Sequence, residues 1–392
     1  MNNMKITAKT LFSGFAALLF SASAFALETG GVLSNDAKFS GNKTSDLDFD
    51  NVVNASAWLR TALSDDGSSY FIMEGSFKNE YDDSVADSDE KMSNTLDVTL
   101  FKLALHRELA SGDVTFVTGR FFNSDASGLV FSQNADGLKI DYDAYSFKIA
   151  LFGAYTGLLN AKNTTILDYD QPELDNDKLY VVANKYAVAG LTFVLPHIVA
   201  NQTVALEGFG TFSLEDTKYN RLYGTLSLSG PLVSPLFYDL SSTLGFSSYD
   251  GADFKVANLT KGSLSLYPDF KSMSVSLNAV YASGSQGPFE KFQGFTSMTA
   301  VNSLDEPEYS GIVTTGLSAT IKPLEQLLLR ASGDIVFDAT EEIEQAGFQY
   351  AVGFDWQIVS DVALGASFGQ YIGKDNSDAD KTVLKCNIRI AF

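Results

Sequence analysis

Apolar and polar residues alternate along the last ten residues of the chain, VLKCNIRIAF. Leu384, Cys386, Ile388, Ile390 and Phe392 fall on one face of an extended segment, with polar and charged residues between them. A period of two is typical of a β-strand with one face in water and the other in an apolar environment. A protein core and a lipid bilayer both provide such an environment, so other features must distinguish them.

The same alternation recurs throughout the chain. It is clear in FQYAVGFDWQIV (348–359), SMSVSLNAVYA (272–282), LFYDLSSTLGF (236–246) and QLLLRASGDIVFD (326–338). Further runs fit at 53–63, 70–78, 138–142, 147–155, 204–212 and 222–228. Within 96–105 the parity switches between Leu100 and Phe101, which a β-bulge would explain.

Every second connection between these segments is short, such as DDG near Asp65 and SD at Ser360. The connections between them are longer and mostly acidic, as at 80–94, 123–136, 160–178 and 284–309. Outer-membrane barrels have this layout, with tight periplasmic turns and longer outward loops. We therefore predict an all-β fold: a single closed antiparallel transmembrane β-barrel of 16–18 strands with both termini periplasmic.

The first 26 residues resemble a secretory signal peptide. Lys5 and Lys9 precede an apolar stretch at 11–20, and Ala24-Phe25-Ala26 fits the cleavage pattern. The apolar stretch is shorter than the ~20 residues that a spanning helix needs. We predict a signal peptide at 1–26, a barrel domain at 27–392 and an outer-membrane location.

A soluble sandwich or propeller would also alternate. Lipid is favoured because aromatic residues lie near the ends of the apolar faces, as in Tyr238, Phe246 and Trp356. Serine, threonine, glycine and asparagine dominate the opposite faces, together with isolated charges. A lysine or arginine facing lipid costs about 2–4 kcal/mol at mid-bilayer, and the alternation turns Arg330 and Arg389 inward.

Composition and motifs exclude several functions. The net charge of −21 argues against nucleic acid, because phosphate binding depends on lysine and arginine. Cys386 is the single cysteine, so no internal disulfide forms. The two histidines lie at predicted strand ends or turns, and no catalytic motif accompanies them. We therefore expect no enzyme activity and no cofactor. We also expect no metal site, since the acidic stretches 46–50 and 82–90 lack EF-hand spacing.

Charged residues on the inward face are the candidates for lining a pore. Mixed charges in a pore tune which solutes pass, whereas charges paired across strands, such as Arg330 with Asp355, would also stabilise the wall. The predicted pore-lining residues are Arg60, Glu74, Arg120, Lys139, Asp141, Glu207, Asp239, Arg330, Asp334, Asp355, Lys385 and Arg389.

Two short stretches resemble known families. The ending Cys386, Ile388, Ile390, Phe392 is similar to the C-terminal signal that hands bacterial outer-membrane proteins to the barrel-assembly machinery. GRFFNSDASGLVFSQNADG (119–137) resembles porin segments whose loop folds into the pore, which implies that Arg120 is a constriction residue. The chain also loosely resembles uncharacterised spirochaete outer-membrane barrels.

These observations lead to two functional hypotheses. The first is a porin that passes small hydrophilic solutes or ions through a lumen narrowed by an infolded loop, with 123–136 and 284–309 as the candidate loops. The excess of lumen carboxylates hints at a preference for cations. The second is a plugged barrel that acts as an adhesin or receptor through its acidic loops, with 156–180 folded across the mouth. The resemblance to porins of this size implies a homotrimer.

Overall fold

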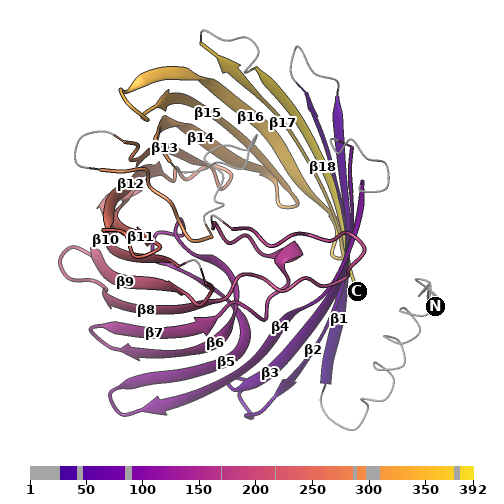
Figure 1. The fold of residues 1–392 in the computed structure, drawn as a ribbon, viewed down its shortest axis with the longest axis vertical. Helices are drawn as coiled ribbons and strands as arrows, with labels where there is room; N and C mark the ends of the chain where they lie inside the picture. Colours follow the sequence, from indigo (N-terminus) through magenta and orange to yellow (C-terminus); the bar gives the residue numbers. More distant parts are fainter. Residues whose placement is uncertain are drawn as a thin grey trace.

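The chain forms one closed ring of antiparallel strands (Figure 1). This computed structural model describes residues 27–41, 47–83, 91–168, 170–216, 218–285, 289–296, 310–374 and 380–392. The predicted signal peptide therefore lies outside the described residues. No helix among the described residues is long and apolar enough to cross a membrane.

The ring contains eighteen strands, each paired with its neighbours in sequence. Their bounds are β1 (Leu27–Gly41), β2 (Asp48–Ala62), β3 (Tyr70–Asp82), β4 (Met92–Leu109), β5 (Gly112–Ser124), β6 (Ser132–Ala144), β7 (Lys148–Tyr155), β8 (Tyr186–Leu195), β9 (Thr203–Ser213), β10 (Tyr219–Val233), β11 (Leu236–Tyr249), β12 (Lys255–Leu266), β13 (Ser274–Ala282), β14 (Ile312–Leu324), β15 (Leu327–Asp338), β16 (Glu344–Val359), β17 (Val362–Gly373) and β18 (Lys381–Ala391).

The ring closes where the first strand meets the last. β1 pairs antiparallel with β18, from Val32 opposite Ala391 to Gly41 opposite Thr382. Gly31 and Phe392 extend this seam by exchanging two backbone hydrogen bonds, of 2.8 and 3.0 Å. The predicted closed antiparallel barrel is thereby confirmed, with the strand number at the upper end of the expected range. The start of β1 and the end of β18 lie beside the short turns. That these turns face the periplasm stays a prediction.

A β-bulge in β4 explains the switch of parity seen in the sequence. Glu74 pairs with Leu100 and Gly75 with Val98, so Thr99 is the extra residue. Before the bulge Leu96 is an exposed outer residue, and after it Phe101 is one. The bulge therefore keeps the apolar residues of β4 on the outer face along its whole length.

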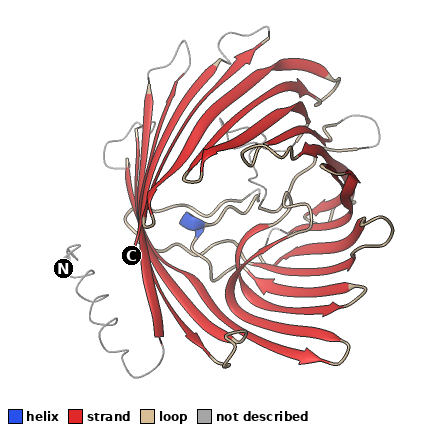
Figure 2. Ribbon diagram, turned by 180° about the vertical axis from the view of Figure 1, so that it is seen from behind, coloured by secondary structure: helices blue, strands red, loops and turns tan. Residues whose placement is uncertain are grey.

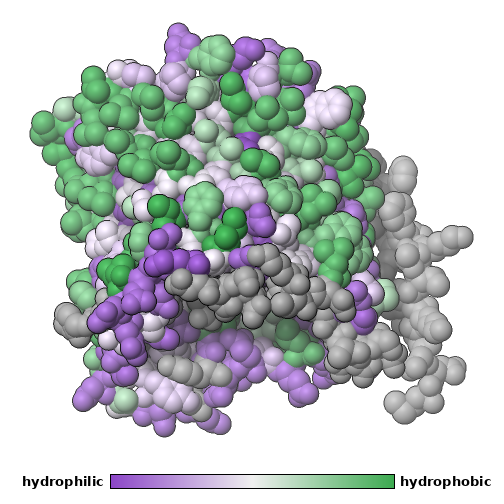
Figure 3. Space-filling view, turned by 90° about the horizontal axis from the view of Figure 1, so that it is seen from above, coloured by the Kyte–Doolittle hydropathy of each residue, from purple (hydrophilic) through white to green (hydrophobic). Residues whose placement is uncertain are grey.

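The outer face of the barrel is apolar. Large hydrophobic side chains on strand after strand are exposed there, and Figure 3 shows hydrophobic residues spread over the wall while hydrophilic residues gather toward one end. Representative outer residues are Leu138, Leu151, Leu191, Leu206, Leu226, Leu240, Leu277, Leu317, Leu329, Val352 and Leu384. Such exposure would be costly in water, so an apolar medium must cover this face.

Parts of three connections fold into the barrel, as Figure 2 shows for the short 3₁₀ helix η1 (Ala161–Asn163), drawn in blue inside the ring. We call them the first segment (125–131, between β5 and β6), the second segment (156–168 and 170–185, between β7 and β8) and the third segment (289–296, between β13 and β14). Their side chains supply much of the buried apolar cluster.

Candidate functional site

The inner face carries the charged residues that the sequence singled out, with one exception. Directly opposed residues of an antiparallel pair point to the same face. Lys139 opposes Phe152, whose ring contacts the first segment in the interior, and the same parity extends around the ring. The register places on the inner face Arg60, Glu74, Lys139, Asp141, Glu207, Asp239, Arg330, Asp334, Asp355, Lys385 and Arg389.

Several of these charges form ion pairs that water still reaches. Arg330 and Asp355 lie 3.2 Å apart, as the sequence suggested, and their side chains are 47% and 43% exposed. Arg60 likewise pairs with Glu28 at 3.0 Å. Pairs this accessible contribute only about 0–1 kcal/mol to stability. Their larger effect is on the electric field along the inner face of β15–β16 and β1–β2.

Arg120 is the exception, because it lies on the other face of β5 from buried Val117 and Phe121. Its Nε and Nη2 donate to the two carboxylate oxygens of Asp136, both at 2.8 Å, and Nη1 donates to Asp97 at 3.2 Å. Nη2 also donates to the carbonyl of Leu158 in the second segment, at 2.5 Å. With a side chain only 11% exposed, Arg120 ties the β5–β6 hairpin to β4 and to the second segment.

Gly119 makes this placement of Arg120 possible. Its φ of +106° lies in the region that favours glycine, and a Cβ there would lie 1.9 Å from the carbonyl oxygen of Phe101. The glycine before Arg120 is therefore required by a close approach of the β4 backbone.

The first segment is a tight turn organised by the buried side chain of Asp125. This carboxylate accepts backbone hydrogen bonds from Ser127, Val130 and Phe131, at 2.8, 3.0 and 2.8 Å. The turn is fixed to distant wall strands by Glu207 of β9, which accepts from the Ala126 amide at 2.9 Å. On another strand, β12, the Lys261 ammonium donates to the Ser127 carbonyl at 2.6 Å.

The second segment lies against the N-terminal part of β4. The Leu96 amide donates to the carbonyl of Leu179 at 3.0 Å, and Asn163 donates to Asp97 at 3.0 Å. Lys162 donates to the carbonyl of Lys178 at 2.6 Å, and burial lowers the pKa of its ammonium. The segment thus lies alongside β4 where β4 has no neighbour from β5, whose pairing with β4 begins at Phe101.

The third segment joins the other two. The amides of Phe295 and Thr296 donate to the carbonyl of Val130 in the first segment, at 2.8 and 2.9 Å. The amide of Leu167 in the second segment donates to the carbonyl of Phe295 at 2.8 Å. Since the third segment is bonded to both of the others, the three form one unit inside the barrel, which we call the infolded unit.

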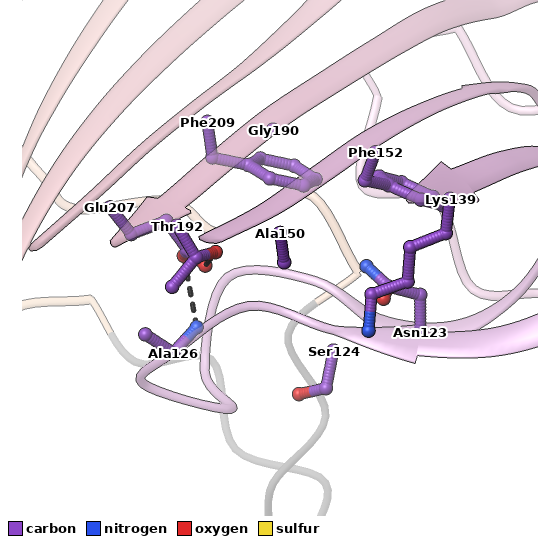
Figure 4. A pocket seen from close by; sticks show the side chains of 10 residues that line it. All are labelled: Asn123, Ser124, Ala126, Lys139, Ala150, Phe152, Gly190, Thr192, Glu207 and Phe209. Atoms are coloured by element: carbon purple, nitrogen blue, oxygen red, sulfur yellow. Dashed lines mark hydrogen bonds between the residues drawn. The ribbon is translucent and has the colours of Figure 1, made fainter. Parts of the chain in front are cut away.

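A cavity of about 190 Å³ lies between the first segment and the wall (Figure 4). Glu207 Oε1 accepts from the Ala126 amide of the turn, and its Oε2 accepts from the Thr192 hydroxyl of β8 at 2.7 Å, so the carboxylate links the turn to the wall. Polar and aromatic side chains share the lining, which consists of Asn123, Ser124, Ala126, Lys139, Ala150, Phe152, Gly190, Thr192, Glu207 and Phe209.

Sequence reasoning missed Arg221 of β10, which is 1% exposed and contacts both the second and third segments. The predicted run of alternation began at residue 222, directly after it. A signal was present, since Tyr219 and Tyr223 flank it at the same parity. Among the described residues no group of three His, Cys, Asp or Glu side chains is arranged to hold a metal ion.

The barrel is similar in fold to solved outer-membrane proteins. OccK7 (OpdD) of Pseudomonas aeruginosa superposes with a TM-score of 0.60 at 10% identity, over 94% of this chain and 99% of that one. OccK5 (OpdH) of the same organism superposes with a TM-score of 0.59 at 11% identity, over 93% of this chain and 98% of that one. The outer membrane protein opdK, also of that organism, gives a TM-score of 0.57 at 10% identity, over 93% of this chain and 99% of that one. No family model and no curated protein matches the sequence. The chain therefore has the fold of an outer-membrane β-barrel, and the predicted resemblance is confirmed at this level.

Proposed function

We propose that this protein is an outer-membrane channel through which small hydrophilic solutes or ions diffuse passively, without enzyme activity. The proposal rests on the accessible charges of the inner face, above all the ion pair of Arg330 with Asp355, in a closed ring of eighteen strands. A ring of 16–18 strands is wide enough to enclose an aqueous path. The side chains of Arg330 and Asp355 are about half exposed, as expected if water fills the space beside β15 and β16.

Selectivity in this proposal comes from the wall charges and the infolded unit together. The infolded unit lies in the interior beside β4–β12. Its contacts there include the hydrogen bonds to Glu207 of β9 and Lys261 of β12. Solutes would then pass between this unit and the wall formed by β15–β18, β1 and β2. The negative charge of the chain supports a modest preference for cations.

Conductance of the purified barrel in a planar lipid bilayer tests the proposal. We expect discrete conductance steps and a reversal potential in a salt gradient that indicates cation preference. Heat-modifiable migration on a gel would show that the sample is folded. A folded barrel that gives no conductance would exclude the channel.

A second function is supported by the interlocked infolded unit: a barrel whose filled interior carries no flux and whose acidic outer loops bind a surface. The Asp83–Lys91 pair of the β3–β4 connection marks one such acidic loop. Deletion of 84–90 that abolishes attachment to host cells or matrix, in a barrel without conductance, would favour this adhesin or receptor.

We propose that the barrel-assembly machinery recognises the C-terminal signal at Cys386, Ile388, Ile390 and Phe392. Ile388, Ile390 and Phe392 are 39%, 38% and 70% exposed on the outer face, and Cys386 is exposed as well. This apolar row is available to the barrel-assembly machinery, and a homotrimer in the outer-membrane bilayer is the expected assembly. Cross-linking in native membranes tests the trimer.

A further inference from the structure

Arg221 connects the wall of the barrel to two of the three infolded segments. Its Nη1 donates to the carbonyl of Leu167 in the second segment, at 2.6 Å, and to the carbonyl of Gly294 in the third segment, at 3.1 Å. The side chain belongs to β10, and its residue is 1% exposed. One wall residue therefore holds two connections that are far apart in the sequence.

Aromatic rings enclose the same guanidinium. Its central carbon lies 4.2 Å from the ring centroid of Tyr219, 5.0 Å from that of Phe295 and 5.6 Å from that of Tyr186. Cation–π attraction is strongest when the cation is removed from water, as it is here. Phe295 belongs to the third segment, so the rings also couple the wall to the infolded unit.

The hydrogen bonding of Arg221 is incomplete. Among the described residues its Nε and Nη2 have no hydrogen-bond partner, although both atoms are buried. A buried donor without a partner carries a desolvation penalty that disappears when water reaches it. Outward movement of the two segments would hydrate these nitrogens, so part of the free energy lost with the carbonyl and ring contacts would be recovered.

We propose that Arg221 is the positioning residue that fixes the infolded unit and thereby sets the width of the conducting path. This inference rests on the proposed channel function. The guanidinium contacts no solute; it acts through the second and third segments, which it holds against β10. Weakening it would release both segments together, because Leu167 and Phe295 are bonded to one another.

Single-channel recording of Arg221→Gln and Arg221→Lys tests this role. Glutamine loses the charge and the flat face that the rings enclose, whereas lysine keeps the charge but reaches fewer acceptors. We expect Arg221→Gln to raise conductance at least about twofold with a wider spread of open levels, and Arg221→Lys to have a smaller effect. Arg330→Gln is the matched control, since Arg330 also lies on the inner face but is half exposed. It removes a charge without releasing a segment, so the spread of open levels should stay narrow.

Cysteine labelling gives a readout that does not depend on conductance. Ile166 in the second segment is 5% exposed, so Ile166→Cys in a Cys386→Ser background reports whether the segment stays in place. A membrane-impermeant maleimide should label this introduced thiol at least about tenfold faster when Arg221→Gln is added. Arg330→Gln should leave the labelling rate unchanged.

The outcomes separate the two proposals. If the parent barrel does not conduct but Arg221→Gln speeds labelling of the Ile166→Cys variant, the channel fails, while the part of the inference that Arg221 fixes the infolded unit stands. If a folded Arg221→Gln variant shows unchanged conductance and unchanged labelling, the positioning role is overturned. Should that variant not fold, Tyr219→Leu decides instead, because it removes the ring nearest the guanidinium and leaves the charge in place; unchanged labelling would again overturn the role.

Discussion

The ring of Phe131 stacks on that of Phe295, with centroids 6.1 Å apart and an interplanar angle of 14°. Both residues are fully buried, and they come from different connections of the barrel. Phe131 also contacts Phe152 and Phe209 of the wall, at centroid distances of 5.7 and 5.3 Å. Aromatic packing therefore joins the infolded unit to the inner face, in addition to its hydrogen bonds.

Phe131→Ala should remove the centre of this aromatic packing. We expect a loss of about 3–5 kcal/mol in the free energy of unfolding, because truncating a fully buried phenylalanine leaves a cavity that its neighbours fill only in part. Urea unfolding in detergent micelles measures the change. Phe122→Ala is the control: Phe122 is 60% exposed and should cost far less. Equal losses in the two variants would contradict the packing described here.

Arg120→Met should destabilise the barrel by about 3–5 kcal/mol, because it leaves the buried carboxylate of Asp97 and the partly buried carboxylate of Asp136 without their cation. Adding Asp136→Asn should cost less than the two single changes predict together, since the pair acts as one unit. The double-mutant cycle is measured by the same urea unfolding. Arg330→Met, at an exposed ion pair, should change stability by less than about 1 kcal/mol. A similar effect at both arginines would show that Arg120 is solvated.

Leu317→Lys and Ser318→Lys test the two faces of β14 at neighbouring positions. Leu317 is 58% exposed on the outer face, and Ser318 accepts a hydrogen bond from Asn278 on the inner face. In lipid, a lysine at 317 should cost about 2–4 kcal/mol, while a lysine at 318 is hydrated and tolerated. Folding yield into liposomes of defined thickness measures the difference. The reverse order of yields would mean that the outer face does not contact acyl chains.

Asp355→Asn and Arg330→Gln should shift ion selectivity in opposite directions. Removing the carboxylate lowers the cation-to-anion permeability ratio, and removing the guanidinium raises it, by about 1.5- to 3-fold each. The reversal potential in a salt gradient reports both changes. Asp65→Asn in a short turn provides a control away from the inner face. If ion selectivity is unchanged in both variants, the conducting path does not pass Arg330 and Asp355.

Period-two alternation predicted the closed barrel, and it located the bulge at Thr99 to within two residues. Both depend on local patterning, because neighbouring strands pair in sequence order. The infolded unit could be predicted only in part. The connections 123–136 and 284–309 were predicted as infolded loops, but the sequence pattern gave no indication of which residues of the two loops contact each other. The partners of Arg120 and Arg221 depend on contacts between distant segments, which a single sequence does not specify.

The seam between β1 and β18 has a consequence for biogenesis. Gly31 and Phe392 bond to each other at the junction of β1 and β18, so the pairing of these two strands completes the ring. Before these two strands pair, β1 and β18 are open edges whose amides and carbonyls can pair with other chains. Each molecule must therefore be kept apart from other chains until β1 and β18 have paired, and a change that weakens this seam would expose both edges to neighbouring molecules.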